Sequence, residues 1–312
     1  MFCIIAFVVL SILGIFSATN RALAREAMDC VFRRVTLRPC NTGFDEKMKA
    51  KILGKVINRS EGAARLISKN FELLSWIFFI LMLASSVWAV VGLYNFYVTG
   101  SCNGLNDESF CVFDPNGANN QVSSVSSTCS LTPTSANDLT LNGVNLDGFP
   151  VLDKSAADKI VFIGCYSCEY TRKTYPMIMD LVNHFGVSFT FLHYPVKEPT
   201  DQLSRLGYCV NQQDPAKLWK LNDTLFAADR ADLEKDSFIQ KTLVDLGLDT
   251  GKITTCVNDP LTEDTVKKQM AEIEKTGFYG TPTVFINGKA LVGPKPYRVY
   301  AITLEGLFYW LK

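Results

Sequence analysis

Residues 159–185 read KIVFIGCYSCEYTRKTYPMIMDLVNHF, and this stretch decides the fold. Its first five residues, 159–163, form a short apolar run of the kind that makes a buried strand. From 168 to 185 the pattern becomes helical. Cys165 and Cys168, in a C-x-x-C spacing, therefore stand where a strand turns into a helix. Free backbone N–H groups and the positive end of the helix meet at such a junction, and both stabilise a thiolate over a thiol.

The remainder of the C-terminal half continues this alternation of strands and helices. We predict a strand over 187–192, a helical block over 199–276, a β-hairpin with strands at 283–286 and 289–292, and a last helix over 297–311. The order is strand–helix–strand, a helical block, then two strands and a helix. This order predicts an α/β fold with a helical insertion.

The cysteine pair is suited to disulfide exchange. A thiolate is the species that attacks a disulfide, and a neighbouring thiol can resolve the mixed disulfide that forms. A zinc site would need a second paired cluster of ligands, but Cys209 and Cys256 are single and 47 positions apart. A copper site would add a histidine, and we expect His184 and His193, which are the two histidines, to pack or cap instead. We therefore predict no metal and no cofactor.

A second motif, together with the cysteine pair, points to a particular protein family. Residues 280–289 read GTPTVFINGK, just before the predicted hairpin. Together with the strand–C-x-x-C–helix segment and the helical insertion, this motif resembles the DsbA-like branch of the thioredoxin superfamily over about 151–312. The resemblance implies a thioredoxin-like fold and protein-disulfide oxidoreductase activity. It also implies a cis peptide bond at Pro282 and contact of Thr281 with substrate peptide.

The resemblance carries two further implications. Some members of the family join the cysteines that flank the insertion, which here implies a structural disulfide between Cys209 and Cys256. Relatives also carry a buried acid on the first strand, six residues before the attacking cysteine, as a proton shuttle. The corresponding residue is Lys159 if Cys165 attacks and Phe162 if Cys168 attacks. Neither residue is an acid, so this chain departs from the family's pattern at that position.

The identity of the attacking cysteine is open. Cys165 is the default, because the first cysteine of a C-x-x-C motif usually attacks. However, Ser167 is a good helix N-cap, which predicts that the helix begins at Cys168. Relatives commonly carry a helix proline eight residues after the attacking cysteine, and Pro176 is eight residues after Cys168. In this register Thr171 takes the usual resolving position. We therefore predict that Cys168 attacks and Cys165 resolves.

Nearby charges bear on the same question. Lys159, Arg172 and Lys173 would favour a thiolate at Cys168, whereas Glu169 would oppose it.

The N-terminal part predicts a membrane anchor. No charge occurs between Glu72 and Asp107, and residues 73–98 are apolar enough to span a bilayer. Residues 2–17 form a shorter apolar run, with a signal-peptide core as the alternative. Twelve cations against five acids over 19–70 place that loop in the cytoplasm by the positive-inside rule. The predicted divisions are a first transmembrane helix at 1–18, a basic cytoplasmic loop at 19–70, a second transmembrane helix at 71–98, an extracytoplasmic stalk at 99–150 and the thioredoxin-like domain at 151–312.

Ten cysteines in 312 residues indicate disulfides and hence an oxidising compartment for at least part of the chain. In the predicted cytoplasmic loop we expect Cys30 and Cys40 to be reduced. The stalk is rich in Ser, Thr, Asn and Gly, which predicts a loose tether that Cys102 and Cys111 can pin. Cys129 has no evident partner.

The predicted protein is a multi-pass enzyme of the cell membrane with its catalytic domain outside the cytoplasm. It would form, reduce or isomerise disulfides in exported proteins, and it would need a membrane or extracytoplasmic redox partner. A formal net charge of zero argues against a whole-chain nucleic-acid binder. The alternative is a non-catalytic thioredoxin-fold module that binds peptide or metal at the membrane. A redox-active Cys165–Cys168 pair distinguishes the two.

Overall fold

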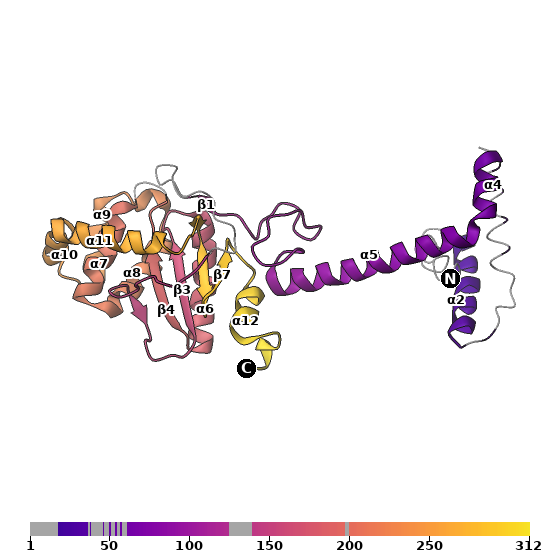
Figure 1. Ribbon diagram of the computed structural model, residues 1–312. Coiled ribbons are helices and arrows are strands. Elements are labelled where there is room, and N and C mark those ends of the chain that lie inside the picture. Colours follow the sequence, from indigo (N-terminus) through magenta and orange to yellow (C-terminus); the bar gives the residue numbers. More distant parts are fainter. Residues whose placement is uncertain are drawn as a thin grey trace. The chain divides into compact units, whose positions relative to one another are not determined.

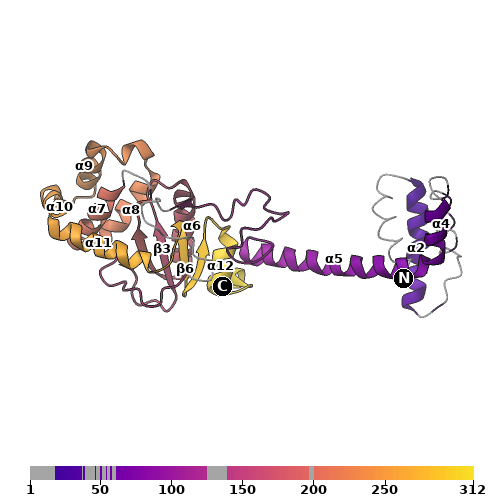
Figure 2. The same cartoon turned by 45° about the horizontal axis from the view of Figure 1, so that its top comes forward.

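A computed structural model describes residues 18–36, 38, 46, 50, 54, 57, 61–124, 139–196 and 200–312. The chain forms two compact units, Met1–Val91 and Gly92–Lys312. Figures 1 and 2 show the helices and strands of each unit.

The first unit is helical in its described parts. It contains α2 (Ala18–Val35), α4 (Glu61–Lys69) and most of α5 (Phe71–Thr99). Among the described residues, Trp76–Thr99 of α5 is the one helical segment long and apolar enough to cross a membrane. The predicted first span over 2–17 lies outside the described residues, so two transmembrane helices are not established.

One cysteine of the first unit differs from expectation. Cys30 is disulfide-bonded rather than reduced, and its side chain is fully buried. The expectation rested on the charge of the segment 19–70, which bears on membrane topology and carries no information on which cysteines meet. Disulfides are rare in the cytoplasm, so this bond and the positive charge of the loop point to opposite sides of a membrane. Cys40 lies outside the described residues.

The second unit is built on a five-stranded mixed sheet. Its strand order is β2 (Val151–Leu152), β4 (Ser188–His193), β3 (Lys159–Gly164), β6 (Thr283–Ile286) and β7 (Lys289–Val292). β3 pairs parallel with β4 and antiparallel with β6, so β3 lies at the centre of the sheet. All of β3 after its first residue is buried, as the apolar run predicts. This arrangement places the end of β3, with the two cysteines directly after it, in the middle of the domain.

Helices cover the sheet and build the insertion. The insertion helices gather at the side of the domain away from α12 in both views (Figures 1 and 2). The predicted last helix over 297–311 is shorter than expected, because Gly306 ends it at a positive φ of 86° and a 3-10 turn follows. The helices and turns of the unit are α6 (Glu169–Phe185), α7 (Asp201–Gln213), α8 (Pro215–Ala227), η2 (Arg230–Asp232), α9 (Asp236–Asp245), α10 (Thr250–Val257), α11 (Pro260–Glu274), α12 (Tyr297–Glu305) and η3 (Tyr309–Leu311).

The predicted loose stalk is wrong for residues 99–124, which are folded onto the sheet. The side chain of Asn106 bridges two backbone groups of β7, donating to Ala290 O at 2.9 Å and accepting from Val292 N at 2.8 Å. Further along, β1 (Ser123–Ser124) pairs antiparallel with β5 (Gly280–Thr281). The abundance of Asn suggested a loose tether, but these amides satisfy backbone groups of distant strands, which a composition argument cannot detect.

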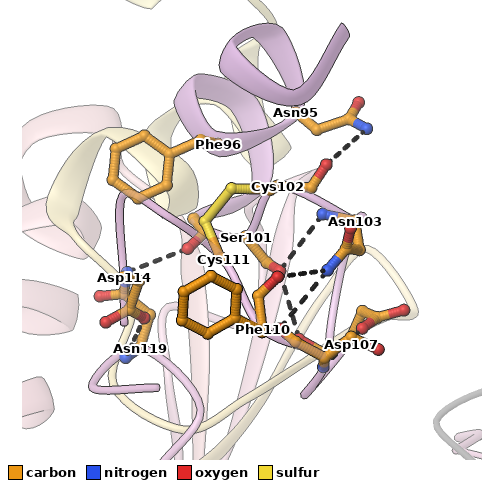
Figure 3. The surroundings of a disulfide bond; sticks show 12 residues. Asn95, Phe96, Ser101, Cys102, Asn103, Asp107, Phe110, Cys111, Asp114 and Asn119 are labelled. Carbon is orange, nitrogen blue, oxygen red and sulfur yellow. Dashed lines mark hydrogen bonds between the residues drawn. A yellow bond between two sulfur atoms is a disulfide. The ribbon is translucent and has the colours of Figure 1, made fainter. Parts of the chain in front are cut away.

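A disulfide between Cys102 and Cys111 closes the first loop of this segment. Figure 3 shows its surroundings, where Asn95 of α5 donates to the carbonyl oxygen of Cys102 at 3.1 Å. At the other end of the loop, the backbone N–H of Asp114 donates to the carbonyl oxygen of Cys111 at 3.1 Å. Backbone groups at both ends of the loop are therefore hydrogen-bonded.

Candidate active site

Cys168 caps the first turn of α6. Its backbone is extended, with φ −75° and ψ 121°, and its Sγ accepts from the backbone N–H of Thr171 at 3.4 Å. The helix proper begins at Glu169, so Cys168 itself, and not Ser167, is the N-cap residue. The predicted helix start was wrong by one residue. The consequence is favourable to a thiolate, because an N-cap side chain faces the free N–H groups of the first turn.

The loop before β6 meets this sulfur. Thr281 and Pro282 are joined by a cis peptide bond. The Sγ of Cys168, as a thiol, donates to the carbonyl oxygen of Thr281 at 3.3 Å. The structure thus brings Thr281 and Pro282, predicted from the GTPT motif, to the reactive pair.

Cys165 lies in the turn between β3 and α6 and is surrounded by hydroxyls. Its Sγ is 3.3 Å from Ser167 Oγ and 3.4 Å from Thr200 Oγ1. Its backbone N–H donates to Thr171 Oγ1 at 3.5 Å, and its carbonyl oxygen accepts from the N–H of Cys168 at 3.1 Å. Both cysteines are free thiols, and both are fully buried.

The pKa of Cys168 lies below the ordinary value for a thiol. Burial opposes the charged form and raises this pKa, but hydrogen bonds to the thiolate, chiefly from Ser123 and Thr171, outweigh burial. The cause differs from the predicted one, which relied on nearby cations. Lys173 instead pairs with Glu169 at 2.8 Å on the surface of α6.

The other two cations expected to favour the Cys168 thiolate, Arg172 and Lys159, also have different surroundings. Arg172 donates to the carbonyl oxygens of Tyr166, at 3.0 Å, and Ala228, so it ties the C-x-x-C turn to the end of α8. Lys159 is exposed at the start of β3, and the cysteines follow the other end of that strand.

If Cys168 attacks, the residue at the position of the family's buried acid is the apolar Phe162. Phe162 is fully buried among the aromatic rings of the core, packed with Phe189 and Phe191 at ring-centroid distances of 6.3 and 5.9 Å. The polar groups near the pair are instead the hydroxyls of Ser123, Ser167, Thr171 and Thr200. Sequence reasoning did not identify Ser123 or Thr200, because both approach from segments far along the chain.

A buried polar group lies beside the turn. The phenol of Tyr166, between the two cysteines in sequence, donates to Asn222 Oδ1 at 2.6 Å. Its ring packs against the imidazole of His193 in a tilted pair, with 4.4 Å between the ring centroids. His193 Nδ1 is 2.7 Å from Ser204 Oγ. Burial lowers the pKa of His193 to about 3, so its imidazole is neutral at ordinary pH. This histidine is therefore part of the packing beneath the turn.

No group of three or more potential metal ligands occurs within the described parts of the chain. His184 is exposed near the end of α6.

The structure joins Cys209 of α7 to Cys256 of α10 by a disulfide, as the family resemblance implied. The bond links two helices of the insertion.

A family profile described as a DSBA-like thioredoxin domain matches residues 166–305. Among solved structures, the thiol-disulfide exchange protein alpha-DsbA2 from Wolbachia pipientis is 16% identical with a TM-score of 0.46, covering 50% of this chain and 86% of that protein. A periplasmic thioredoxin-like protein from Salmonella enterica serovar Typhimurium is 18% identical with a TM-score of 0.44, covering 51% and 88%.

Among curated proteins, an uncharacterized protein of Mycobacterium tuberculosis is 33% identical over 55 residues. That alignment spans 18% of this chain and 24% of the relative. The match to the family profile includes Cys168, the insertion and the Thr281–Pro282 loop. Over residues 166–305 the chain therefore resembles a DSBA-like thioredoxin domain.

Proposed function

We propose that this protein is a membrane-anchored thiol–disulfide oxidoreductase in which Cys168 attacks and Cys165 resolves. The observation that carries the proposal is the state of Cys168. It is a free thiol at a helix N-cap with a lowered pKa, against the Thr281–Pro282 loop and three residues from a second free thiol. A thiolate beside a second thiol is what disulfide exchange requires.

The reaction consists of two exchanges. The Cys168 thiolate attacks one sulfur of a substrate disulfide, which forms a mixed disulfide and releases the other substrate sulfur as a thiolate. Deprotonated Cys165 then attacks Cys168 Sγ, which forms the Cys165–Cys168 disulfide and releases the second substrate thiolate. Two electrons pass from the cysteine pair to the substrate, and two protons follow them to the released thiolates. The same steps in reverse oxidise a substrate dithiol.

The turnover requires a redox partner. A dithiol or disulfide protein in the same compartment returns the Cys165–Cys168 pair to its starting state. A binding-only module is not favoured, because such a module has no need of two free cysteines or of a thiol with a lowered pKa.

Two features support a location at a membrane, with the domain in an oxidising compartment. Helix α5 is apolar over Trp76–Thr99, and its large side chains are exposed around the helix, as in Trp88 at 79% and Ile80 at 59%. Such a helix is typical of a lipid environment. The disulfides Cys102–Cys111 and Cys209–Cys256 are typical of exported proteins. Substrates would then be exported proteins with thiols or disulfides.

Trapping of mixed disulfides tests the proposed roles. The full-length Cys165→Ser variant, incubated with an oxidised protein such as insulin, should accumulate a reductant-sensitive conjugate through Cys168. The matched Cys168→Ser variant should form far less of it. Conjugates that form only with Cys168→Ser would mean that Cys165 attacks and Cys168 resolves. The absence of a conjugate with either variant would contradict the proposed activity.

A further inference from the structure

The two sulfurs of the reactive pair are inaccessible as the chain is folded. Cys165 and Cys168 each have 0% of their surface exposed. Disulfide exchange requires the attacking sulfur to touch the sulfur of another molecule. The segment that covers Cys168 must therefore be identified, and it must move before exchange can occur.

Part of this cover is the chain's own strand β1. Ser123 is buried and lies opposite Thr281 in the antiparallel pair of β1 and β5. The carbonyl oxygen of Thr281 accepts from Cys168 at 3.3 Å, so Ser123 and Cys168 both lie against Thr281. A polypeptide that brought a disulfide to Cys168 along Thr281 would take the place of Ser123.

Two glycines beside β1 allow its backbone to approach closely. A Cβ atom added at Gly280 would lie 2.7 Å from Val122 Cγ2 and 2.8 Å from the carbonyl oxygen of Ser123. A Cβ added at Gly293 would lie 2.7 Å from the backbone carbon of Asn120. Two glycines therefore leave the room that the segment 120–123 occupies. Val122 is half-buried and packs against the apolar cluster that contains both cysteines.

Side-chain hydrogen bonds anchor the described residues before β1, and the last residue they anchor is Asn120. Asn120 contacts Lys295 through its side-chain oxygen and donates to the carbonyl oxygen of Asp107 at 2.8 Å. Its neighbour Asn119 donates to the carbonyl oxygen of Gly100 at 2.9 Å and is itself held by Asp114 (Figure 3). Beyond this anchor, the described pairing with β5 extends over two residues. Loss of this described pairing would leave the side-chain anchors at Asn119 and Asn120 in place.

We propose that Val122–Ser124 is an internal competitor that occupies the substrate edge of this domain. This inference rests on the proposed oxidoreductase function. The partner that fits the edge is an extended polypeptide that lies antiparallel to Gly280–Thr281, with a small residue opposite Thr281. Substrate binding exchanges one strand for another, and the exposure of Cys168 is coupled to the departure of Ser123.

The test measures the accessibility of Cys168 separately from its ionisation. The full chain, reduced and in detergent, is alkylated with iodoacetamide across a pH series, and mass mapping follows the peptide that contains Cys168. The midpoint of the rate profile reports the pKa, and the plateau at high pH reports access. The variants are Val122→Gly, which removes packing from the strand, and Ser124→Pro, which removes a backbone N–H from it. The matched control is Val112→Gly, because Val112 is 73% exposed in the same segment.

The proposal predicts that both strand variants raise the plateau rate about fivefold or more, since weakening a two-residue pairing removes roughly one or two hydrogen bonds. The control should stay within about twofold of the wild type. Equal plateaus for the wild type and both strand variants would overturn the proposal.

A second assay separates this inference from the proposed function. The rate of exchange with an oxidised protein should rise in the strand variants together with the plateau. A raised plateau without any exchange activity would reject the oxidoreductase function while leaving the covering strand in place. A melting temperature close to that of the control shows that the increase does not come from general unfolding.

Discussion

The Sγ of Cys168 and the carbonyl oxygen of Thr281 lie 3.3 Å apart, although 113 positions separate the two residues in the sequence. The contact joins the first turn of α6 to Thr281, the last residue of β5, and Ser123 of β1 lies opposite Thr281. The sulfur that we propose as the attacking atom therefore lies beside the pairing of two short strands.

We predict that Cys168 reacts before Cys165. The pKa of Cys168 is lowered, so its thiolate forms at lower pH than that of an ordinary thiol, and its alkylation rate rises as the pH climbs through this pKa. Brief alkylation of the reduced protein at pH 7, followed by mass mapping, should label Cys168 preferentially. Preferential labelling of Cys165 would restore the default assignment for a C-x-x-C motif.

The Ser123 hydroxyl should contribute to this reactivity. Ser123→Ala removes one hydrogen bond to the thiolate, which should move the pKa of Cys168 upward and lower its thiolate fraction at pH 7. A lost bond of about 1 kcal/mol corresponds to roughly a fivefold lower alkylation rate at that pH. Ser109→Ala, an exposed serine of the same segment, is the control. An unchanged midpoint in Ser123→Ala would show that the hydroxyl does not stabilise the thiolate.

The Cys209–Cys256 bond should stabilise the fold more than the Cys102–Cys111 bond does. The sequence separations are 47 and 9 residues. In the chain-entropy model these loops correspond to about 4 and about 3 kcal/mol. Denaturant unfolding of the Cys209→Ala/Cys256→Ala variant, compared with the Cys102→Ala/Cys111→Ala variant, measures the difference. A larger loss of unfolding free energy in the Cys102→Ala/Cys111→Ala variant would contradict this prediction. It would mean that the docking of residues 99–124 contributes more to stability than loop closure does.

The stability of the fold should fall in mild acid because of His193. Its folded pKa of about 3 lies below the ordinary 6.5, so the unfolded chain binds this proton first as the pH falls. The free energy of unfolding is unaffected by this proton well above pH 6.5, and it is about 2 kcal/mol lower at pH 5. His193→Gln should remove this part of the pH dependence, whereas His184→Gln, at an exposed histidine, should not. Parallel stability curves for the wild type and His193→Gln would contradict the prediction.

Membrane topology can be read with single cysteines at exposed sites. A membrane-impermeant maleimide added to intact cells should label Lys154→Cys in the domain and leave Glu61→Cys unlabelled. The expected asymmetry follows from the twelve cations between residues 19 and 70. Labelling of Glu61→Cys would place that segment outside the cytoplasm, in keeping with the disulfide at Cys30.

The sequence predicts those parts of the fold that depend on neighbouring residues. The apolar run before Cys165 predicts β3, and the spacing from Cys168 to Pro176 places Cys168 at the start of α6. Asn287 and Gly288 predict the hairpin, and both adopt the positive φ that its turn needs.

The features that sequence reasoning missed depend on residues that meet only in three dimensions. Ser123 reaches Cys168 through pairing with Thr281, and Asn106 reaches β7 across 186 positions. A local pattern of Ser and Asn describes such residues equally well as a loose tether or as a docked segment. The cations expected to stabilise the thiolate were misjudged for the same reason, since Arg172 is close in sequence but turns to backbone carbonyls of Tyr166 and α8.

The most direct test is the redox equilibrium of the cysteine pair. The full chain is equilibrated in glutathione buffers of graded potential, quenched in acid, alkylated and mapped for the peptide that contains Cys165 and Cys168. Reversible conversion between dithiol and disulfide, with a tenfold change in their ratio for about 30 mV, is the predicted result. Two thiols that stay reduced across the whole series, or that oxidise only to bonds with other cysteines, would contradict the account.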